Sequence, residues 1–140
     1  MALTMLAVLL FCGCEGKELG SESNPEAEKA ATESAEVWLG LVDSGRYSQS
    51  WEQAAAYFKT SITKDAWQKY FQLLREPLGR MISRKLISCQ YTTSIPGVPK
   101  GEYVVIQYSS FFEKKRDVIE TVTPVLDKDG NWRVSGYFIK

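Results

Sequence analysis

The sequence predicts an α+β fold in which three N-terminal helices pack on one face of a four-stranded antiparallel sheet. Two observations support this prediction. Up to about residue 76, apolar residues recur every three or four positions, as in helices with one buried face. From residue 80 onward the period becomes two, and Val, Ile, Tyr, Phe and Thr predominate, as in strands. We therefore expect a single domain with its helices first and its strands last.

The first helix is predicted over Glu26 to Asp43, where the apolar residues form one stripe. Asn24 is a good N-cap residue, and Pro25 suits the first helical position because that position needs no amide donor. Gly45 follows the last residue of the stripe and provides a stop signal. The sequence thus defines both ends of this helix.

Two further helices are expected before the sheet. A short second helix begins near Tyr47 and includes Phe58, with Ser48 or Ser50 as its N-cap. Thr63 then caps a third helix, predicted over Lys64 to Glu76 and ended by the following proline. These three helices should present their aromatic faces to the sheet.

Four strand-like runs follow, and short turns rich in Gly, Pro, Asp and Lys separate them. Consecutive strands joined by short turns favour an antiparallel meander. Asp129 and Gly130 form a strong hairpin signal in the last turn. The predicted strands are Arg80–Thr92, Glu102–Phe112, Val118–Asp127 and Trp132–Ile139.

Composition excludes several classes of function. The chain has 140 residues, with 17 Lys plus Arg and 17 Asp plus Glu, so no overall charge attracts nucleic acid. It contains no His, the side chain best suited to proton transfer at neutral pH and the commonest metal ligand. We find no phosphate-binding loop, nucleophile elbow or metal-spaced cluster. The sequence therefore predicts no catalytic residue, no metal site and no cofactor.

The N-terminus predicts export and lipidation. Met1 to Phe11 is almost wholly apolar, too short to span a bilayer but typical of a signal peptide. The following residues resemble the bacterial lipobox, because Gly13 stands directly before Cys14 and a large apolar residue stands three before it. The resemblance implies lipid attachment at Cys14 and membrane anchoring. The alternatives are a secretory signal without lipidation and a frayed apolar N-terminus.

These features divide the chain into residues 1–14 as signal and lipobox, 15–24 as a flexible tether and 25–140 as one domain. The tether is rich in Glu, Gly and Ser and has no apolar periodicity. If Cys14 carries lipid, Cys89 is left as the single cysteine of the domain, and we expect it to be a buried, inert thiol.

A set of aromatic, Gly and Pro positions resembles the DUF4019 domain of bacterial secreted proteins and lipoproteins, over about Glu26 to Lys140. The resemblance implies a cystatin-like or NTF2-like architecture with helices cradled by a curved sheet, and it implies no particular function. The residues that carry it are 38–51 (WLGLVDSGRYSQSW), Trp67, 77–79 (PLG), Arg84, 95–103 (IPGVPKGEY), 120–122 (ETV) and 129–137 (DGNWRVSGY).

Glu120 is the most unusual residue of the predicted sheet, because strict alternation places its carboxylate on the apolar face. A carboxylate there needs a partner, and Arg84 or Arg133 could provide one. Glu120 is therefore either part of a structural ion pair or a pocket acid that contacts a ligand. A bulge near Pro124 that changes the register is the third possibility.

Candidate cleft aromatics are Trp38, Trp51 and Trp67, although their helical spacing first indicates a place in the core. Together these features predict a lipid-anchored protein of the bacterial envelope, in the inner or outer membrane and facing the periplasm. Its domain would bind another envelope protein or a small ligand without catalysis. The alternative is a small-molecule-binding or catalytic NTF2-like domain that uses a pocket carboxylate such as Glu120.

Overall fold

The computed structural model describes residues 23–140. The predicted lipidation signal with Cys14, and all but the last two residues of the predicted tether, lie outside this part of the chain. Within residues 23–140, none of the helices has both the length and the apolarity that crossing a membrane requires.

The described residues form four α-helices followed by one sheet of four antiparallel strands, in the order β1-β2-β3-β4. The predicted α+β class and the four-stranded meander are therefore confirmed. The helices are α1 (Pro25–Asp43), α2 (Tyr47–Glu52), α3 (Ala56–Ser61) and α4 (Lys64–Arg75), and a single 3-10 turn, η1 (Glu76–Leu78), follows them. The strands are β1 (Met81–Thr92), β2 (Tyr103–Phe112), β3 (Val118–Leu126) and β4 (Trp132–Ile139).

The ends of α1 and the start of α4 follow the predicted capping signals. The Asn24 side chain accepts a hydrogen bond from the amide of Ala27, and Pro25 occupies the first turn. After α1, Gly45 adopts a left-handed conformation with φ of 75°, which favours glycine. Thr63 caps α4 by accepting from the amide of Ala66. These contacts span only a few residues, so the sequence alone could predict them.

The prediction of one helix between Tyr47 and Phe58 is wrong, because this segment forms two short helices, α2 and α3. Neither serine caps α2, whose N-cap residue is Arg46. The break falls at Ala54 and Ala55, which are completely buried. The amide of Ala55 donates to the carbonyl of Val134 in β4 at 2.8 Å. A backbone contact with the sheet therefore replaces a helical hydrogen bond.

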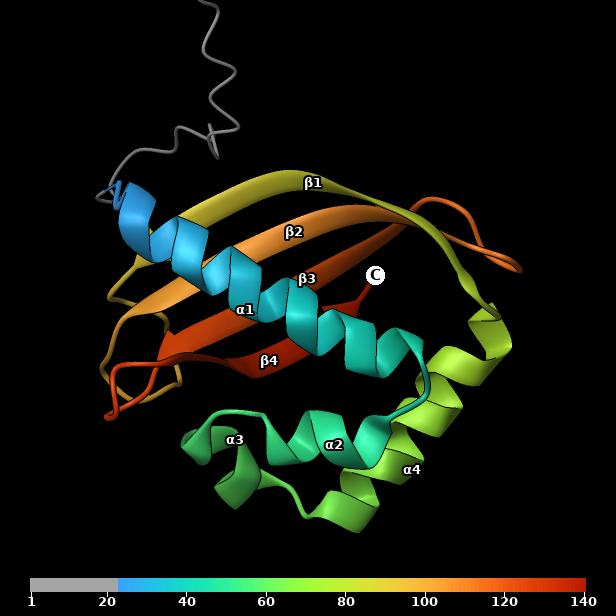
Figure 1. Ribbon diagram of the computed structural model, residues 1–140, viewed down its shortest axis with the longest axis horizontal. Coiled ribbons are helices and arrows are strands. Elements are labelled where there is room, and N and C mark those ends of the chain that lie inside the picture. Colours follow the sequence, from blue (N-terminus) through green and yellow to red (C-terminus); the bar gives the residue numbers. More distant parts are fainter. Residues whose placement is uncertain (1–22) are drawn as a thin grey trace, which may run out of the picture.

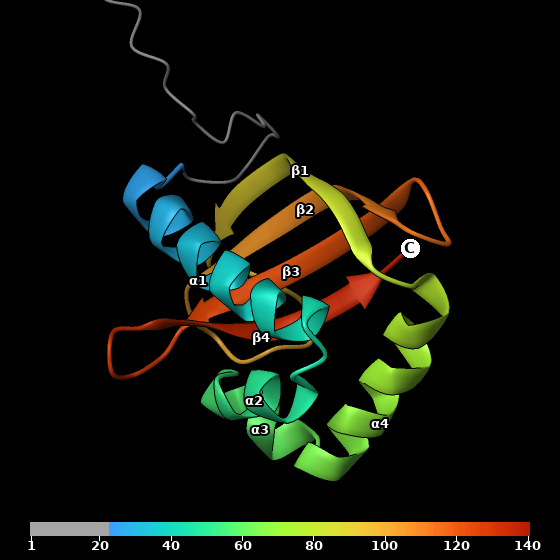
Figure 2. The ribbon, with the colours of Figure 1, turned by 45° about the vertical axis from the view of Figure 1, so that its right-hand side comes forward.

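The helices lie on one side of the sheet. Helix α1 runs along this face and contacts all four strands, while α2, α3 and α4 lie beyond β4 (Figures 1 and 2). Between α1, α4 and the sheet, Trp38, Trp67, Phe71 and Tyr137 pack ring against ring. Cys89 is buried in the same core, as predicted.

The strand register places Glu120 on the helix-covered face. It lies opposite Tyr108 of β2 and Ile139 of β4. A register shift does occur between Thr123 and Pro124, near the predicted position. Because the shift follows Glu120 in the chain, the alternation at Glu120 is unaffected and its side chain points into the core.

Candidate functional site

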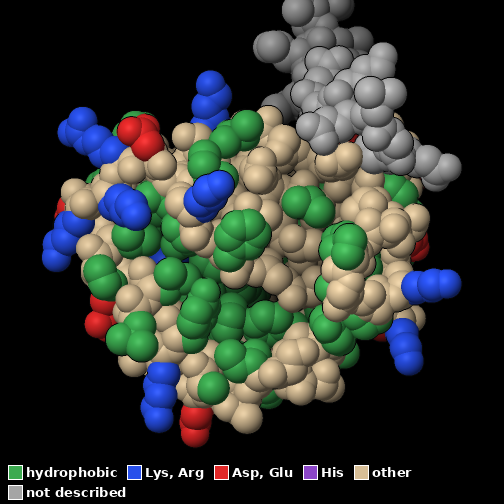
Figure 3. Space-filling view, turned by 180° about the vertical axis from the view of Figure 1, so that it is seen from behind, with side chains coloured by type: hydrophobic (Ala, Val, Ile, Leu, Met, Phe, Trp, Pro, Cys, Tyr) green, Lys and Arg blue, Asp and Glu red, His purple; other side chains and the backbone are tan. Residues whose placement is uncertain are grey.

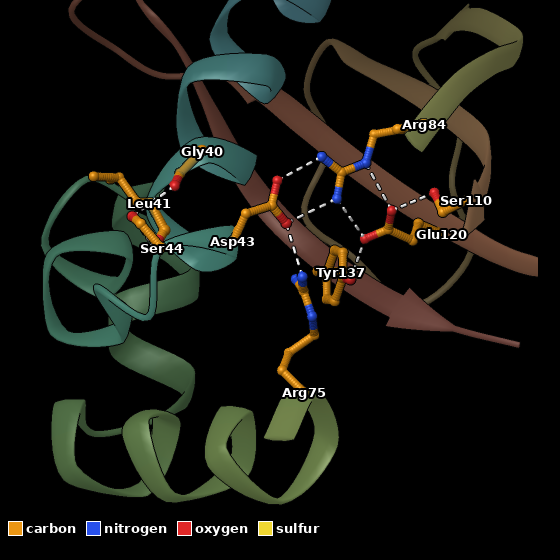
Figure 4. Close-up of polar contacts among 9 residues, drawn as sticks. All are labelled: Gly40, Leu41, Asp43, Ser44, Arg75, Arg84, Ser110, Glu120 and Tyr137. Carbon is orange, nitrogen blue, oxygen red and sulfur yellow. Dashed lines mark hydrogen bonds and ion pairs between the residues drawn. The ribbon is translucent and has the colours of Figure 1, made fainter. Parts of the chain in front are cut away.

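A cluster of polar side chains lies under the C-terminal end of α1 (Figure 4). Every strand and two helices contribute to it. Its members are Asp43 of α1, Arg75 of α4, Arg84 of β1, Ser110 of β2, Glu120 of β3 and Tyr137 of β4. We refer to these six residues as the buried polar cluster.

Glu120 is at the centre of the buried polar cluster and is 0% exposed. Its Oε1 accepts from Arg84 Nε at 2.7 Å and from the Ser110 hydroxyl. Its Oε2 accepts from Arg84 Nη2 at 3.1 Å and from the Tyr137 hydroxyl. Four donors therefore surround the carboxylate and replace the water that it loses on burial.

Arg84 joins the sheet to α1. In addition to Glu120, its guanidinium contacts Asp43, with Nη1 at 2.7 Å from Oδ2 and Nη2 at 3.0 Å from Oδ1. Burial lowers the pKa of Arg84, but the hydrogen bonds to the two carboxylates outweigh burial, so its pKa lies above the usual value. Arg84 is thus a permanent cation held between two anions.

Asp43 is also bound by Arg75, whose Nη2 lies 2.7 Å from Oδ1. Burial raises the pKa of Asp43, but the contacts with Arg84 and Arg75 more than reverse this effect, and its pKa is lowered. Asp43 is the last residue of α1, where the helix dipole disfavours an anion. The two arginines compensate for that unfavourable position.

Arg75 is the least satisfied member of the cluster. Its side chain is 4% exposed, and its Nε and Nη1 have no hydrogen-bond partner among the described residues. Its guanidinium carbon lies 4.7 Å from the centre of the Phe112 ring, so a cation–π contact compensates in part for the missing acceptors.

Tyr137 is the neutral donor of the cluster. Its pKa is raised well above the usual value, first by burial and then by the negative charge of Glu120. The phenol therefore keeps its proton at neutral pH and donates a hydrogen bond to Glu120. Its ring packs against Trp38 with centroids 5.5 Å apart, which fixes the direction of the hydroxyl.

The buried polar cluster contains two cations and two anions, and its charges balance. All six members come from elements that must pack together for the fold to form. Glu120 has no exposed surface through which it could contact a ligand. The arrangement holds α1, α4 and the sheet in one relative position, as a buried network of this kind can do.

A cavity of about 290 Å³ lies beside Asp43 and Arg75, at the outer edge of the cluster. Tyr47 lines it, and burial raises the pKa of this tyrosine. The ionisable lining is balanced, with three acidic and three basic side chains, so no strong field selects an anion or a cation. They are Asp43, Glu76, Glu113, Arg75, Arg80 and Lys114.

A larger groove of about 720 Å³ lies between α3 and the turns that follow β1 and β3. Arg133 is in this groove and not in the buried polar cluster. It donates to Asp127 at 3.1 Å and to Asp129 at 2.8 Å. Of the two partners predicted for Glu120, the structure therefore joins Arg84 to it and places Arg133 elsewhere. The groove is lined by the charged residues Glu52, Lys59, Lys100, Asp127, Lys128, Asp129 and Arg133, together with Tyr57, Tyr103 and several small or apolar residues.

The three candidate cleft tryptophans all have internal partners. Trp38 Nε1 donates to the carbonyl of Ser50 at 2.9 Å, and Trp67 Nε1 donates to the hydroxyl of the same serine at 3.0 Å. Trp51 Nε1 donates to the carbonyl of Ile62 at 2.8 Å. Trp38 and Trp67 are almost completely buried. The structure places these two in the core and Trp51 at its edge.

Sequence reasoning missed Asp43 and Arg75 as members of the cluster, although a signal for each exists. Arg75 follows Trp67 and Phe71 at intervals of four residues, which puts it on the buried face of α4. Asp43 continues the stripe of Ala35 and Leu39 in the same way. A charged residue in an apolar stripe at a helix end predicts a buried partner, and here the two residues are partners of each other.

Comparison with known proteins identifies the family. The model of a family described as a protein of unknown function (DUF4019) matches residues 34–137. No curated protein and no solved structure matches the chain. The matched range includes every member of the buried polar cluster, from Asp43 to Tyr137. The chain therefore belongs to the DUF4019 family.

Proposed function

We propose that this protein is a lipoprotein of the bacterial envelope, anchored through Cys14, whose domain is a non-catalytic binding module facing the periplasm. Its partner would be another envelope protein or a small ligand. We also infer that its architecture is of the cystatin-like or NTF2-like kind. A meander sheet with its helices gathered on one face supports this inference.

The observation that carries the proposal is the complete enclosure of Glu120. A catalytic acid or base must come within hydrogen-bond distance of its substrate, directly or through one water. The Glu120 carboxylate is 0% exposed and already accepts from Arg84, Ser110 and Tyr137. The acid that a catalytic function would use is thus occupied in stabilising the fold, which favours binding over catalysis.

The groove beside α3 is the binding site that we assign to this module. Its volume of about 720 Å³ lies within the usual range for ligand sites. Tyr57 is 41% exposed at its wall, and exposed tyrosines are common anchors in protein interfaces. Its lining includes three lysines, one arginine, two aspartates and one glutamate. These features fit a peptide segment that carries an apolar anchor and charges of both signs.

A capture experiment tests the proposal. The lipidated protein is isolated from membranes with its bound partners, and wild type is compared with Cys14→Ser and with Tyr57→Ala. We expect one partner to be enriched with wild type. With Tyr57→Ala, the captured amount of that partner should fall at least tenfold, because truncating an anchor residue removes much of the binding free energy. Leu73→Ala is the matched control, because Leu73 is an exposed apolar residue of α4 and does not line the groove.

Two results would contradict the proposal. Mass spectrometry that finds Cys14 unmodified in the mature protein would exclude the lipid anchor. Equal capture by Tyr57→Ala and Leu73→Ala would exclude the groove as the binding site. If nothing is enriched and the domain instead binds a metabolite, the module recognises a small ligand and the protein partner is excluded.

A further inference from the structure

A cavity of about 440 Å³ shares the β3–β4 turn with the groove beside α3, but it takes different residues from that turn. It lies beside α1, which is in front of the sheet in Figure 1, and not on the hollowed side that Figure 3 shows from behind. We call it the Trp132 cavity. Its lining includes Glu33, Ser34 and Val37 of α1, Gln53 after α2, Asn131 of the turn and Trp132 of β4.

Trp132 differs from the other three tryptophans of the chain in its indole N–H. Trp38, Trp51 and Trp67 each donate to an acceptor inside the protein. The indole N–H of Trp132 has no hydrogen-bond partner among residues 23–140, and it remains accessible to water. Part of the side chain packs against the core and part lines the cavity. Trp132 can therefore offer a ligand both ring surface and a hydrogen-bond donor.

Contacts within the protein fix the walls next to Trp132. The Ser34 hydroxyl donates to the carbonyl of Trp132 at 2.6 Å, which joins α1 to the start of β4. The backbone amide and the side-chain nitrogen of Asn131 both donate to Asp129 at 3.1 Å. The Asn131 side chain is thus held in the turn, with its Oδ1 left to accept from a ligand. A site that is formed in advance loses less conformational entropy on binding.

The Trp132 cavity carries little charge. Glu33 is the one ionisable side chain in its lining, whereas seven charged residues line the groove beside α3 and six line the cavity beside Asp43. An anion would find no cation here. A cation would find a single exposed carboxylate, whose attraction water and dissolved ions screen. This lining favours an uncharged ligand.

The polar groups of the Trp132 cavity suit hydroxyl groups. The side-chain amides of Gln53 and Asn131 can donate and accept, as a hydroxyl does, while Glu33 accepts and the Trp132 N–H donates. Val37, which is 66% exposed, adds apolar surface to the wall. A purely apolar ligand would displace water from the amides without replacing its hydrogen bonds. The lining therefore disfavours such a ligand.

We propose that the Trp132 cavity binds a neutral sugar ring of an oligosaccharide. The C–H groups on one face of a sugar ring pack on the indole of Trp132, and its hydroxyls exchange hydrogen bonds with Gln53, Asn131 and Glu33. The volume of about 440 Å³ lies within the usual range for small-ligand sites. The proposal depends neither on the lipid anchor nor on the groove beside α3.

Isothermal titration calorimetry tests the proposal with the full chain, in a detergent whose head group is not a sugar. The probes are chitotetraose and maltotetraose, which are neutral oligosaccharides, and caffeine, which is a flat neutral aromatic molecule without hydroxyls. We expect at least one oligosaccharide to bind and caffeine not to bind, because caffeine leaves the amides of the cavity without hydroxyl partners.

Three variants locate the binding site. Gln53→Ala and Trp132→Phe should each weaken oligosaccharide binding roughly threefold to tenfold, because each removes hydrogen bonds to the ligand. Trp132→Ala should weaken it at least tenfold, because it also removes the ring. The matched control for Gln53→Ala is Gln72→Ala, at an exposed position of α4 outside the cavity, which should bind like wild type.

Circular dichroism and urea unfolding check that the variants remain folded. Because Trp132 also packs against the core, Gln53→Ala provides the test if Trp132→Ala does not fold. The proposal is overturned if neither oligosaccharide binds, or if caffeine binds more tightly than both. It is also overturned if Gln53→Ala and a folded Trp132→Phe bind the oligosaccharide as tightly as Gln72→Ala does, because the sugar then lies elsewhere.

Discussion

Arg84 and Arg133 each bind two carboxylates, but they do so in different surroundings. Arg84 joins Asp43 and Glu120 between α1 and the sheet, whereas Arg133 joins Asp127 and Asp129 at the β3–β4 turn. The contact distances are similar, from 2.7 to 3.1 Å. The Arg84 and Glu120 side chains are 15% and 0% exposed, whereas those of Arg133 and Asp129 are 32% and 50% exposed.

The comparison shows that good ion-pair geometry does not by itself determine stability. Water and dissolved ions screen the contact between Arg133 and Asp129, and both side chains remain solvated when this contact breaks. In the buried polar cluster, a charge that loses its partner has no water to replace it. The ion pairs at the turn therefore contribute little to the stability of the fold, whereas the fold depends on those in the core. Four substitutions or conditions test this difference, and we order them by the size of the expected effect.

Arg84→Ala should have the largest effect. It leaves Asp43 and Glu120 buried without their main partner, which costs about 3–5 kcal/mol of unfolding free energy. Urea unfolding followed by circular dichroism measures the loss. Arg84→Lys is the control, because it retains the charge but loses the two-pronged contact, and its loss should be smaller. If Arg84→Ala unfolds at the same urea concentration as wild type, the cluster contributes nothing to stability.

Glu120→Gln should have an intermediate effect. The amide keeps an acceptor oxygen for Tyr137 or Ser110 but loses the charge that Arg84 binds, and charge-assisted hydrogen bonds contribute about 1.5–3 kcal/mol each to stability. We expect a loss of about 2 kcal/mol of unfolding free energy in the same urea assay, because the ion pair between Arg84 and Asp43 remains. Partner capture by the groove should be unchanged. If capture fails while the variant remains folded, Glu120 has a functional role.

Acid should weaken the cluster through Asp43. Its pKa in the folded protein lies below the ordinary value for an aspartate, because Arg84 and Arg75 bind its carboxylate, so the unfolded chain takes up a proton at a higher pH than the folded protein does. The stabilisation is complete above the unfolded pKa and declines as pH falls through the folded pKa. Urea midpoints between pH 7 and 2 should therefore fall more steeply for wild type than for Asp43→Asn. If the two curves are parallel, Asp43 is not the source of the loss of stability at low pH.

Arg133→Ala should have the smallest effect. Its partner Asp129 is 50% exposed and its partner Asp127 is 16% exposed, and both lie at the β3–β4 turn, where water reaches Arg133 and replaces most of the lost contacts. We expect a urea midpoint that cannot be distinguished from that of wild type, at both low and high salt. A loss comparable to that of Arg84→Ala would show that exposure does not separate the two clusters.

Much of the fold follows from local sequence signals, but only part of the site does. Period-two alternation correctly placed Glu120 on the covered face of the sheet, and shared strand alternation made Arg84 a candidate partner. The contact between Arg84 and Glu120 joins residues 36 positions apart. Sequence alternation determines which face each residue is on, but it does not determine which residues meet across strands. Arg133 therefore remained a second candidate until the register was known.

The sequence by itself determined the α+β class, the caps of α1 and α4, the four strands and the position of Glu120. These depend on hydrogen bonds and periodicities that extend over a few neighbouring residues. Only the tertiary structure decided the break between α2 and α3, the recruitment of Asp43 and Arg75, and the cavity beside Trp132. Each of these depends on packing between segments distant in the chain, where burial changes the free energy of a charge or a backbone amide.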